Sequence, residues 1–302
     1  MKEKTLTLPC PVRDLIPQKG KMGFDQILIK TQRDDSESTA TIKCDNIFLD
    51  DDHQLSDIAL IEYVNQLIAA AQGYHRAING KTAPKGLFVG IQEAFFHQRV
   101  HQGDCLTVKG VTIEEVSQVT FVQGVIERAG IKIAELVTKL YEVKDGPEFG
   151  SLTDGRQMLG ARDAIFLNKS QPPVCLGSDI QRQLYSYMHH IDLGEDLICF
   201  KIACPEDFDA FDGHFPGNPI LPGITLLEIA GLALKLITKK PVRIQSVRKM
   251  KISGMILPNQ VIDCVLKTDR ENGLTVPFSA TFKTEDGRVI SRFTGAGAEG
   301  RG

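Results

Sequence analysis

Two segments of the chain carry apolar residues at nearly every position, which predicts two helices that are buried on all sides. The first covers residues 57–71, with Ser56 as a candidate N-cap and Gly73 close to its end. The second covers residues 224–234 and directly follows a Pro-Gly pair. Helices this apolar need other structure around them.

Each predicted helix contains a single carboxylate near its start, Glu62 in the first and Glu228 in the second. The two residues are 166 positions apart. On composition alone, such a glutamate more often lies at the edge of an exposed stripe than in a catalytic site. Their matching places in two similar helices make both of them candidates.

Each helix is followed by alternating apolar and polar positions, which are typical of antiparallel strands. The predicted strands are residues 106–111, 120–126 and 131–143 in the first half, and 261–267, 274–283 and 289–294 in the second. The turns that open the two sets, at Gly103 and Asn259, are 156 residues apart. The repeated order predicts an α+β fold in which a helix wrapped by a curved antiparallel sheet occurs twice, as a pseudo-symmetric dimer within one chain.

The predicted domain boundaries follow from this duplication. We expect an N-terminal domain at residues 1–147, a linker at residues 148–173 and a C-terminal domain at residues 174–302. The linker is rich in turn residues and weakly periodic, with room for a short helix. The first half holds about ten extra residues after its helix, around residues 79–84.

Composition is that of an ordinary globular protein, with 42% hydrophobic and 24% charged residues. A net charge of −3 gives no electrostatic reason to expect nucleic acid or an anionic membrane as partner. No signal-like start and no uncharged apolar run of about 20 residues is present, so we expect no membrane insertion and a cytoplasmic location. Seven cysteines without CxxC spacing predict buried, reduced thiols and no zinc site.

The segment with the clearest chemical signature, residues 211–224, reads FDGHFPGNPILPGI. His214 in this segment stands fourteen residues before Glu228. The segment resembles the GHFP and LPG signature of the 3-hydroxyacyl-acyl carrier protein dehydratases, and the resemblance covers roughly residues 175–300. Those enzymes have the hotdog fold, so the resemblance implies a double hotdog for the duplicated chain.

The first half resembles a diverged member of the same superfamily. Residues 15–25 are similar to the opening segment of those enzymes, except that Gln18 stands where they usually have histidine. Residues 62–70 resemble their acidic helix, and residues 85–90 are similar to the P-type dehydratase subunit of aryl polyene clusters, whose mate is an I-type subunit. The chain therefore resembles a fusion of a P-like and an I-like subunit.

The first half departs from the active pattern at the histidine. Phe48 stands fourteen residues before Glu62, and His53 lies nearby at the wrong spacing. In the family, histidine and acid come from different protomers of a dimer. The resemblance therefore implies that His214 pairs with Glu62 in one site per chain, and Glu228 is the second choice for the acid.

The implied reaction removes water from a 3-hydroxyacyl thioester, which needs a base for the Cα proton and an acid for the hydroxyl. His214 would be the base and Glu62 the acid; whether Glu62 is protonated, or ionised and orienting a shared proton, stays open. The Gly223 N–H at a helix start is the candidate oxyanion donor. Phe215, Pro222 and Ile224 of the same motif are the candidate substrate contacts. No metal and no organic cofactor is expected.

The expected partner is an acyl carrier protein that delivers the substrate. A basic group of Arg243, Arg248, Lys249 and Lys251 could dock it or be a solvated face. The alternative functions are a hotdog acyl thioesterase and a non-catalytic acyl-chain-binding protein. A homo-oligomer of the pseudo-dimer is possible, and the sequence leaves acyl chain length and the identity of the carrier open.

Overall fold

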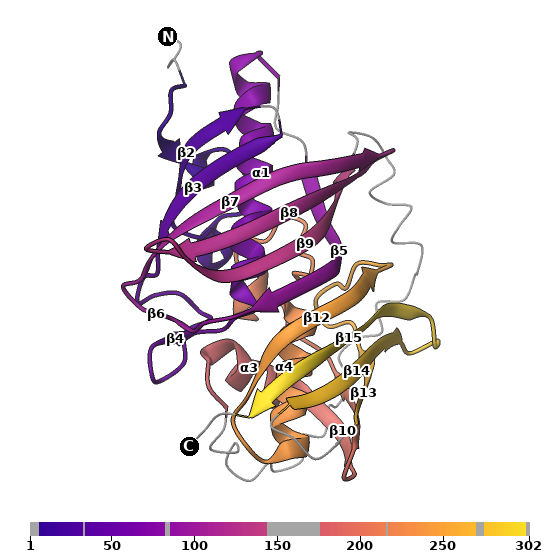
Figure 1. Cartoon of the computed structure of the whole chain (residues 1–302). Helices are drawn as coiled ribbons and strands as arrows, with labels where there is room; N and C mark the ends of the chain where they lie inside the picture. The colour runs from indigo at the N-terminus through magenta and orange to yellow at the C-terminus, as the bar shows by residue number, and fades with distance from the viewer. Residues whose placement is uncertain are drawn as a thin grey trace.

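The computed structural model describes residues 6–32, 34–81, 85–143, 176–215, 217–269 and 275–299. Within these ranges the chain forms a thirteen-stranded antiparallel sheet with two long helices packed against it (Figure 1). The fold is a double hotdog of the α+β class, as predicted. The predicted linker at residues 148–173, with any short helix in it, lies outside the described residues.

The N-terminal domain contributes seven strands of the large sheet and the helix α1 (Ala59–Ile78). The strands in sheet order are β1 (Cys10–Pro11), β2 (Gln26–Gln32), β3 (Asp35–Thr41), β7 (Cys105–Val116), β8 (Val119–Arg128), β9 (Ile131–Val143) and β5 (Lys85–Phe96). Two short helices, η1 (Val12–Asp14) and η2 (Gly20–Met22), and a small sheet of β4 (Gln54–Leu55) and β6 (Val100–His101) complete it. The helix α1 packs on β2, β3, β7, β8 and β9.

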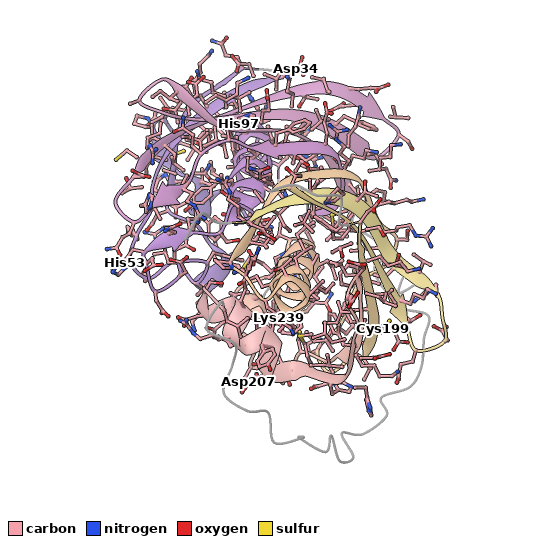
Figure 2. All side chains as sticks on the ribbon, turned by 60° about the horizontal axis from the view of Figure 1, so that its bottom comes forward. Asp34, His53, His97, Cys199, Asp207 and Lys239 are labelled. Atoms are coloured by element: carbon pink, nitrogen blue, oxygen red, sulfur yellow. The ribbon has the colours of Figure 1, made fainter. Side chains whose placement is uncertain are left out.

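The C-terminal domain repeats this plan around the helix α4 (Thr225–Thr238). Its strands in sheet order are β12 (Val242–Ile252), β15 (Val289–Glu299), β14 (Thr275–Thr284), β13 (Ile262–Thr268), β11 (Leu197–Ile202) and β10 (Met188–Leu193). The helices α3 (Asp179–Tyr187) and η3 (Asp209–Phe211) precede α4. Strands of this domain curve around α4 (Figure 2).

The strands β5 and β12 join the two domains into one sheet. Lys251 pairs with Gly90 at one end of this ladder, and Ser246 pairs with Phe95 at the other. The offset between the repeated turns, 156 residues, relates the two pairs: Gly90 corresponds to Ser246, and Phe95 corresponds to Lys251. The register therefore has an internal two-fold that relates the halves with the offset found in the sequence.

The ends of the first helix differ from the prediction. Gly73 lies inside α1 rather than at its end. Glycine is required there because a Cβ would lie 2.3 Å from the carbonyl oxygen of Leu15. Ser56 is not the N-cap: the capping residue is Ile58, without a side-chain cap, and the Ser56 hydroxyl donates to Glu228 instead. Glycine here allows close packing, and serine makes a tertiary contact.

Two expectations from composition can be compared with the described residues. Six of the seven cysteines are described and are free thiols; Cys44 and Cys105 are exposed, so the expectation of buried thiols is wrong for these two. None of the described helices has both the length and the apolar character needed to cross a membrane.

Candidate active site

A cavity of about 310 Å³ lies where the two domains meet. From the N-terminal domain, α1 lines it with Glu62, Asn65, Ala69 and Gln72, whose spacing places them on one face of the helix. From the C-terminal domain, the loop before α4 and the chain after β12 line it, with His214, Phe215, Ile220, Leu221, Gly223, Ser253, Gly254 and Met255. The cavity is therefore composite, since both domains supply its walls.

His214 is buried in the wall of this cavity, with 8% of its surface exposed. Its Nδ1 lies 2.7 Å from the carbonyl oxygen of Ile220. A carbonyl can only accept, so Nδ1 carries the proton and Nε2 is left with a free lone pair. Burial lowers the pKa of His214 to about 4, although the bond to Ile220 opposes the shift. The side chain is thus a neutral imidazole that can accept a proton.

Glu62 lies in the same cavity and is 5% exposed. Burial raises the pKa of its carboxyl to about 7, partly opposed by the hydrogen bond from the Gln66 amide and by the neighbouring Asn65 amide. The Gln66 Nε2 donates to Glu62 Oε1 at 2.9 Å and to the Met22 carbonyl at 2.7 Å. Gln66 also accepts from the Phe24 N–H at 3.1 Å, so its amide is fixed on both sides. The carboxyl is held in place and is protonated in a large fraction of molecules near pH 7.

Gly223 lines the cavity two residues before α4 begins. A Cβ on Gly223 would lie 2.5 Å from Phe88 Cδ1 and 2.6 Å from Ile252 Cδ1, and both of these side chains also line the cavity. Its N–H makes no hydrogen bond with a described residue. A free amide at a helix start favours negative charge, which suits it to an oxyanion.

The candidate substrate contacts are not all in the cavity. Phe215 lines it, with its ring 4.7 Å from the ring of His214. Pro222 and Ile224 are buried and are not among the lining residues. Ile224 caps the start of α4 and is fully covered, so it supports the Gly223 backbone rather than contacting a ligand.

Glu228, the second choice for the acid, lies outside the cavity. It is buried, and its carboxylate accepts hydrogen bonds from the Ser56 hydroxyl and from Gln181 Nε2, the latter at 2.8 Å. The Lys235 ammonium donates to Gln181 Oε1 at 2.6 Å. Burial raises the pKa of Glu228, opposed by these contacts. The structure therefore brings His214 together with Glu62 and not with Glu228.

An ion pair fills the place that the internal two-fold makes equivalent to the cavity. Asp57 stands five residues before Glu62, as Gly223 stands five before Glu228, and Arg243 corresponds to Leu87 through the 156-residue offset. Arg243 Nε donates to Asp57 Oδ2 at 2.8 Å, and Arg243 Nη2 donates to Asp57 Oδ1 at 3.1 Å. Gly223 and Leu87 line the cavity, and at the equivalent positions Asp57 and Arg243 form an ion pair instead.

The remaining histidines of the first half do not enter the site. His53 is exposed in a turn, and it lies at the periphery in Figure 2. His97 pairs with Glu135 at 3.1 Å on the surface. At the position equivalent to His214, Phe48 is buried, and its ring packs 5.9 Å from the ring of Phe24. In the described part of the chain, no cluster of three or more His, Cys, Asp or Glu side chains has a metal-binding arrangement.

Gln66 contributes to the site and was not among the residues predicted from the sequence. It stands four residues after Glu62, which places it on the same face of the helix. A second polar side chain at this spacing, inside an otherwise apolar helix, is the signal that would have identified it. Asn65 and Gln72 also line the cavity, and neither was predicted to do so.

Models of two dehydratase families match the two halves of the chain. The ApeP-like model, described as ApeP dehydratase, matches residues 10–150, and the ApeI-like model, described as ApeI dehydratase, matches residues 190–292. Among curated proteins, the 3-hydroxyacyl-[acyl-carrier-protein] dehydratase FabZ of Lactobacillus helveticus is 26% identical over 101 residues, which cover 31% of this chain and 67% of the relative.

Two solved structures support the fold over most of the chain. The dehydratase domain of PpsC from Mycobacterium tuberculosis, in complex with C12:1-CoA, has a TM-score of 0.53 at 12% identity and covers 90% of this chain and 97% of its own. The 12:0-ACP thioesterase from Umbellularia californica has a TM-score of 0.54 at 10% identity and covers 88% and 94%. The chain belongs to the hotdog dehydratases, with an ApeP-like and an ApeI-like domain joined in one polypeptide.

Proposed function

We propose that this protein dehydrates 3-hydroxyacyl thioesters, carried on acyl carrier protein, to trans-2-enoyl thioesters in fatty acid or polyene biosynthesis. The observation that carries the proposal is the shared cavity, in which His214 and Glu62 meet from different domains. One group is a buried neutral imidazole, and the other is a buried carboxyl with a raised pKa. This is the pair of protonation states that an elimination of water needs.

The reaction follows from these states. The Nε2 of His214 takes the proton from Cα, and negative charge develops on the thioester oxygen. The N–H of Gly223 stabilises that charge. The electron pair then forms the Cα–Cβ double bond while the Cβ–O bond breaks, and the Glu62 proton goes to the departing hydroxyl to form water. At the end of the reaction His214 is an imidazolium and Glu62 is a carboxylate. Proton exchange then restores the neutral imidazole and the protonated carboxyl.

A basic surface beside the cavity supports an acidic carrier as partner. Lys139, Lys249 and Lys251 line a shallow hollow that shares Val89 and Ile252 with the catalytic cavity. Lys251 pairs across the strands with Arg292, which extends this basic surface onto β15. None of these four cations forms an ion pair with a described residue, although Lys139 lies over the ring of Phe121.

Two members of the basic group named from the sequence do not belong to this surface. Arg243 is paired with Asp57 and mostly covered, with 16% of its side chain exposed. Arg248 is exposed, but it lies over the ring of Phe95 and opposite Glu93 in the strand ladder. The docking proposal therefore rests on Lys249 and Lys251 with two cations that the sequence analysis did not include.

Cytoplasmic location and further assembly are part of the same proposal. Free thiols at all six described cysteines are typical of a reducing compartment. Exposed apolar side chains on β2 and β7 favour association of two molecules of the pseudo-dimer. These side chains are Ile27, Ile29, Val111, Ile113 and Val116. Sedimentation of the purified chain tests this association.

The function is tested by incubating the full chain with a 3-hydroxyacyl pantetheine thioester. Enoyl absorbance supports dehydration, release of free thiol supports a thioesterase, and binding without either product supports an acyl-chain-binding protein. His214→Ala and Glu62→Gln should each lower the rate of enoyl formation by about 10²–10⁴-fold. Glu228→Gln is the matched control and should retain most of the rate. A loss with Glu228→Gln and not with Glu62→Gln contradicts the composite site.

The docking surface is tested separately with a carrier-bound substrate. Lys251→Glu should raise KM for the carrier-bound substrate about tenfold and leave kcat/KM for the pantetheine thioester unchanged. Lys267→Glu makes the same charge change at an exposed site on β13 and serves as the control. An equal rise in KM with both substitutions would show that carrier binding depends on net charge and not on this surface.

A further inference from the structure

Residues 18–22, which end in the short helix η2 and are named here the bridging loop, connect the N-terminal domain to the histidine of the C-terminal domain. The Lys19 N–H donates to the carbonyl of Gly213 at 2.9 Å, directly before His214 in the sequence. The fit is close, because a Cβ on Gly213 would lie 1.8 Å from the Lys19 carbonyl oxygen. The Met22 N–H adds a bond to the Asp212 carbonyl at 3.3 Å. The loop is thus fixed against the segment that positions His214.

The same loop also contacts the support of the acid. The Met22 carbonyl accepts from Gln66 Nε2, and the same nitrogen donates to Glu62. Lys19 and Met22 of one short segment therefore bind the residue before His214 and the amide that holds Glu62. A side chain that enters the cavity from this loop therefore comes from a segment bound to the supports of both groups.

Gln18 is the side chain that enters the cavity from the bridging loop. It is 7% exposed, and its Oε1 is buried without a hydrogen-bond partner among the described residues. A buried amide oxygen left unpaired costs about 1–3 kcal/mol. Buried polar groups in native proteins are normally satisfied, so an unpaired one on a side chain that lines a cavity indicates a ligand that satisfies it.

The chemistry of the substrate indicates which group this is. An amide oxygen needs a donor. The thioester oxygen and sulfur can only accept, and the oxygen is already assigned to the Gly223 N–H. The 3-hydroxyl is the group at the reacting end that donates, and it can accept a proton from Glu62 while it donates to Gln18.

We propose that Gln18 binds the 3-hydroxyl of the substrate and the water formed from it. The proposal rests on the proposed function and deepens it, because it assigns recognition of the hydroxyl to a residue outside the dyad. Gln18 selects substrates that carry the hydroxyl over saturated or already dehydrated chains. It also holds the leaving oxygen next to the Glu62 proton.

The test compares binding of two ligands to the full chain. Binding is measured for the His214→Ala variant and for the double variant His214→Ala with Gln18→Leu, so that turnover is slow during the measurement. Calorimetry then measures 3-hydroxybutanoyl-pantetheine against butanoyl-pantetheine, which lacks only the hydroxyl. Gln18→Leu should weaken binding of the hydroxylated ligand about tenfold and leave the saturated ligand unchanged, as expected for one lost hydrogen bond of about 1.4 kcal/mol.

A matched control is available in the same cavity. Gln72 also lines it, and it lies ten residues along α1 from Glu62, a distance of about 15 Å. Gln72→Leu makes the same chemical change away from the dyad and should leave the preference for the hydroxyl intact. Gln18→His, which retains a donor and an acceptor, should restore part of that preference.

Two results would overturn the proposal. Gln18→Leu could weaken both ligands equally, which would make Gln18 a residue that only shapes the cavity, or it could leave both unchanged. Folding is followed independently by circular dichroism, and Gln18→His keeps the test decisive if Gln18→Leu does not fold. Failure of this proposal and failure of the proposed function give different results. If only the proposed function fails, the wild-type chain forms no enoyl product but still binds the hydroxylated ligand more tightly than the saturated one.

Discussion

Asp57 and Arg243 form a two-point ion pair across the boundary between the two domains, with distances of 2.8 and 3.1 Å. The Arg243 Nη2 also donates to the Phe96 carbonyl at 3.2 Å, so the guanidinium is bound on two sides. Burial raises the pKa of Asp57 to about 6 in spite of the arginine. This pair closes the second pseudo-equivalent site and connects the domains at the same time.

The ion pair should matter for stability and not for catalysis. Arg243→Leu leaves a buried carboxylate without its partner, which costs about 3–5 kcal/mol of unfolding free energy. The double variant Asp57→Asn with Arg243→Leu should recover most of that loss, as measured by thermal unfolding. Below its melting temperature the single variant should retain dehydration. Equal melting temperatures for the single and double variants would contradict this reading.

The pH dependence of kcat/KM should have two limits set by the dyad. The base is available above the pKa of His214, about 4, and the acid is protonated below the pKa of Glu62, about 7. We expect a plateau between these values and a tenfold fall per pH unit above about 7. Initial rates with a pantetheine thioester measure this. A rate that instead rises from pH 7 to 9 would mean that Glu62 acts in its ionised form.

The raised pKa of Glu62 also predicts a cost in stability. Because the folded-state pKa is about 7 and the ordinary value is 4.5, the contribution of this group to the unfolding free energy declines as pH rises from 4.5 to 7 and stays low above it. Glu62→Gln removes the ionisation. It should therefore stabilise the protein at pH 8 by about 2–3 kcal/mol and have little effect at pH 4.5.

Unfolding of the two proteins at both pH values checks this prediction. Other buried carboxyls, such as Asp57 and Glu228, titrate in both proteins and cancel in the comparison. Glu228→Gln serves as the control for loss of hydrogen bonds, since its carboxylate is bound by Ser56 and Gln181. A destabilised Glu62→Gln at pH 8 would mean that the bond from Gln66 outweighs the burial of charge.

Gly223→Ala should damage turnover more than folding. The added Cβ would lie within 2.6 Å of both Phe88 and Ile252, so the helix start or these side chains must move. A displaced oxyanion donor lowers kcat by about 10²-fold, as expected for loss of a single donor. KM for the thioester should change little. A kcat within twofold of the wild type would remove the Gly223 N–H from the mechanism.

Much of the architecture could be predicted from the sequence, because hydrophobic period and turn residues are local signals. Both long helices and the six predicted strands lie where the pattern places them, and β9 has the predicted bounds of residues 131–143. The strands β5 and β12, which directly follow the helices and join the domains, were not predicted. The two-fold offset of 156 residues was readable from the positions of two turns. The helix α1 continues past Gly73, since this glycine allows close contact with Leu15 and does not end the helix.

The parts that could not be predicted depend on tertiary partners. Nothing local to Ser56 indicates that its hydroxyl binds Glu228, which is 172 residues away. The resemblance to dehydratases suggested which carboxylate faces His214, and the shared cavity was visible only in three dimensions. Pro222 and Ile224 belong to the same motif as Gly223, yet they face the protein interior, since neighbouring residues of a turn point in different directions.

Continuation of the sheet from β5 into β12 has a consequence for the amount of working enzyme. Separate subunits that share a reaction centre dissociate on dilution, and identical subunits can also pair with each other in unproductive combinations. Here the complementary halves are covalently tethered, so their effective concentration is set by the chain and not by expression level. Every folded molecule carries one centre, at any dilution and at a fixed one-to-one stoichiometry.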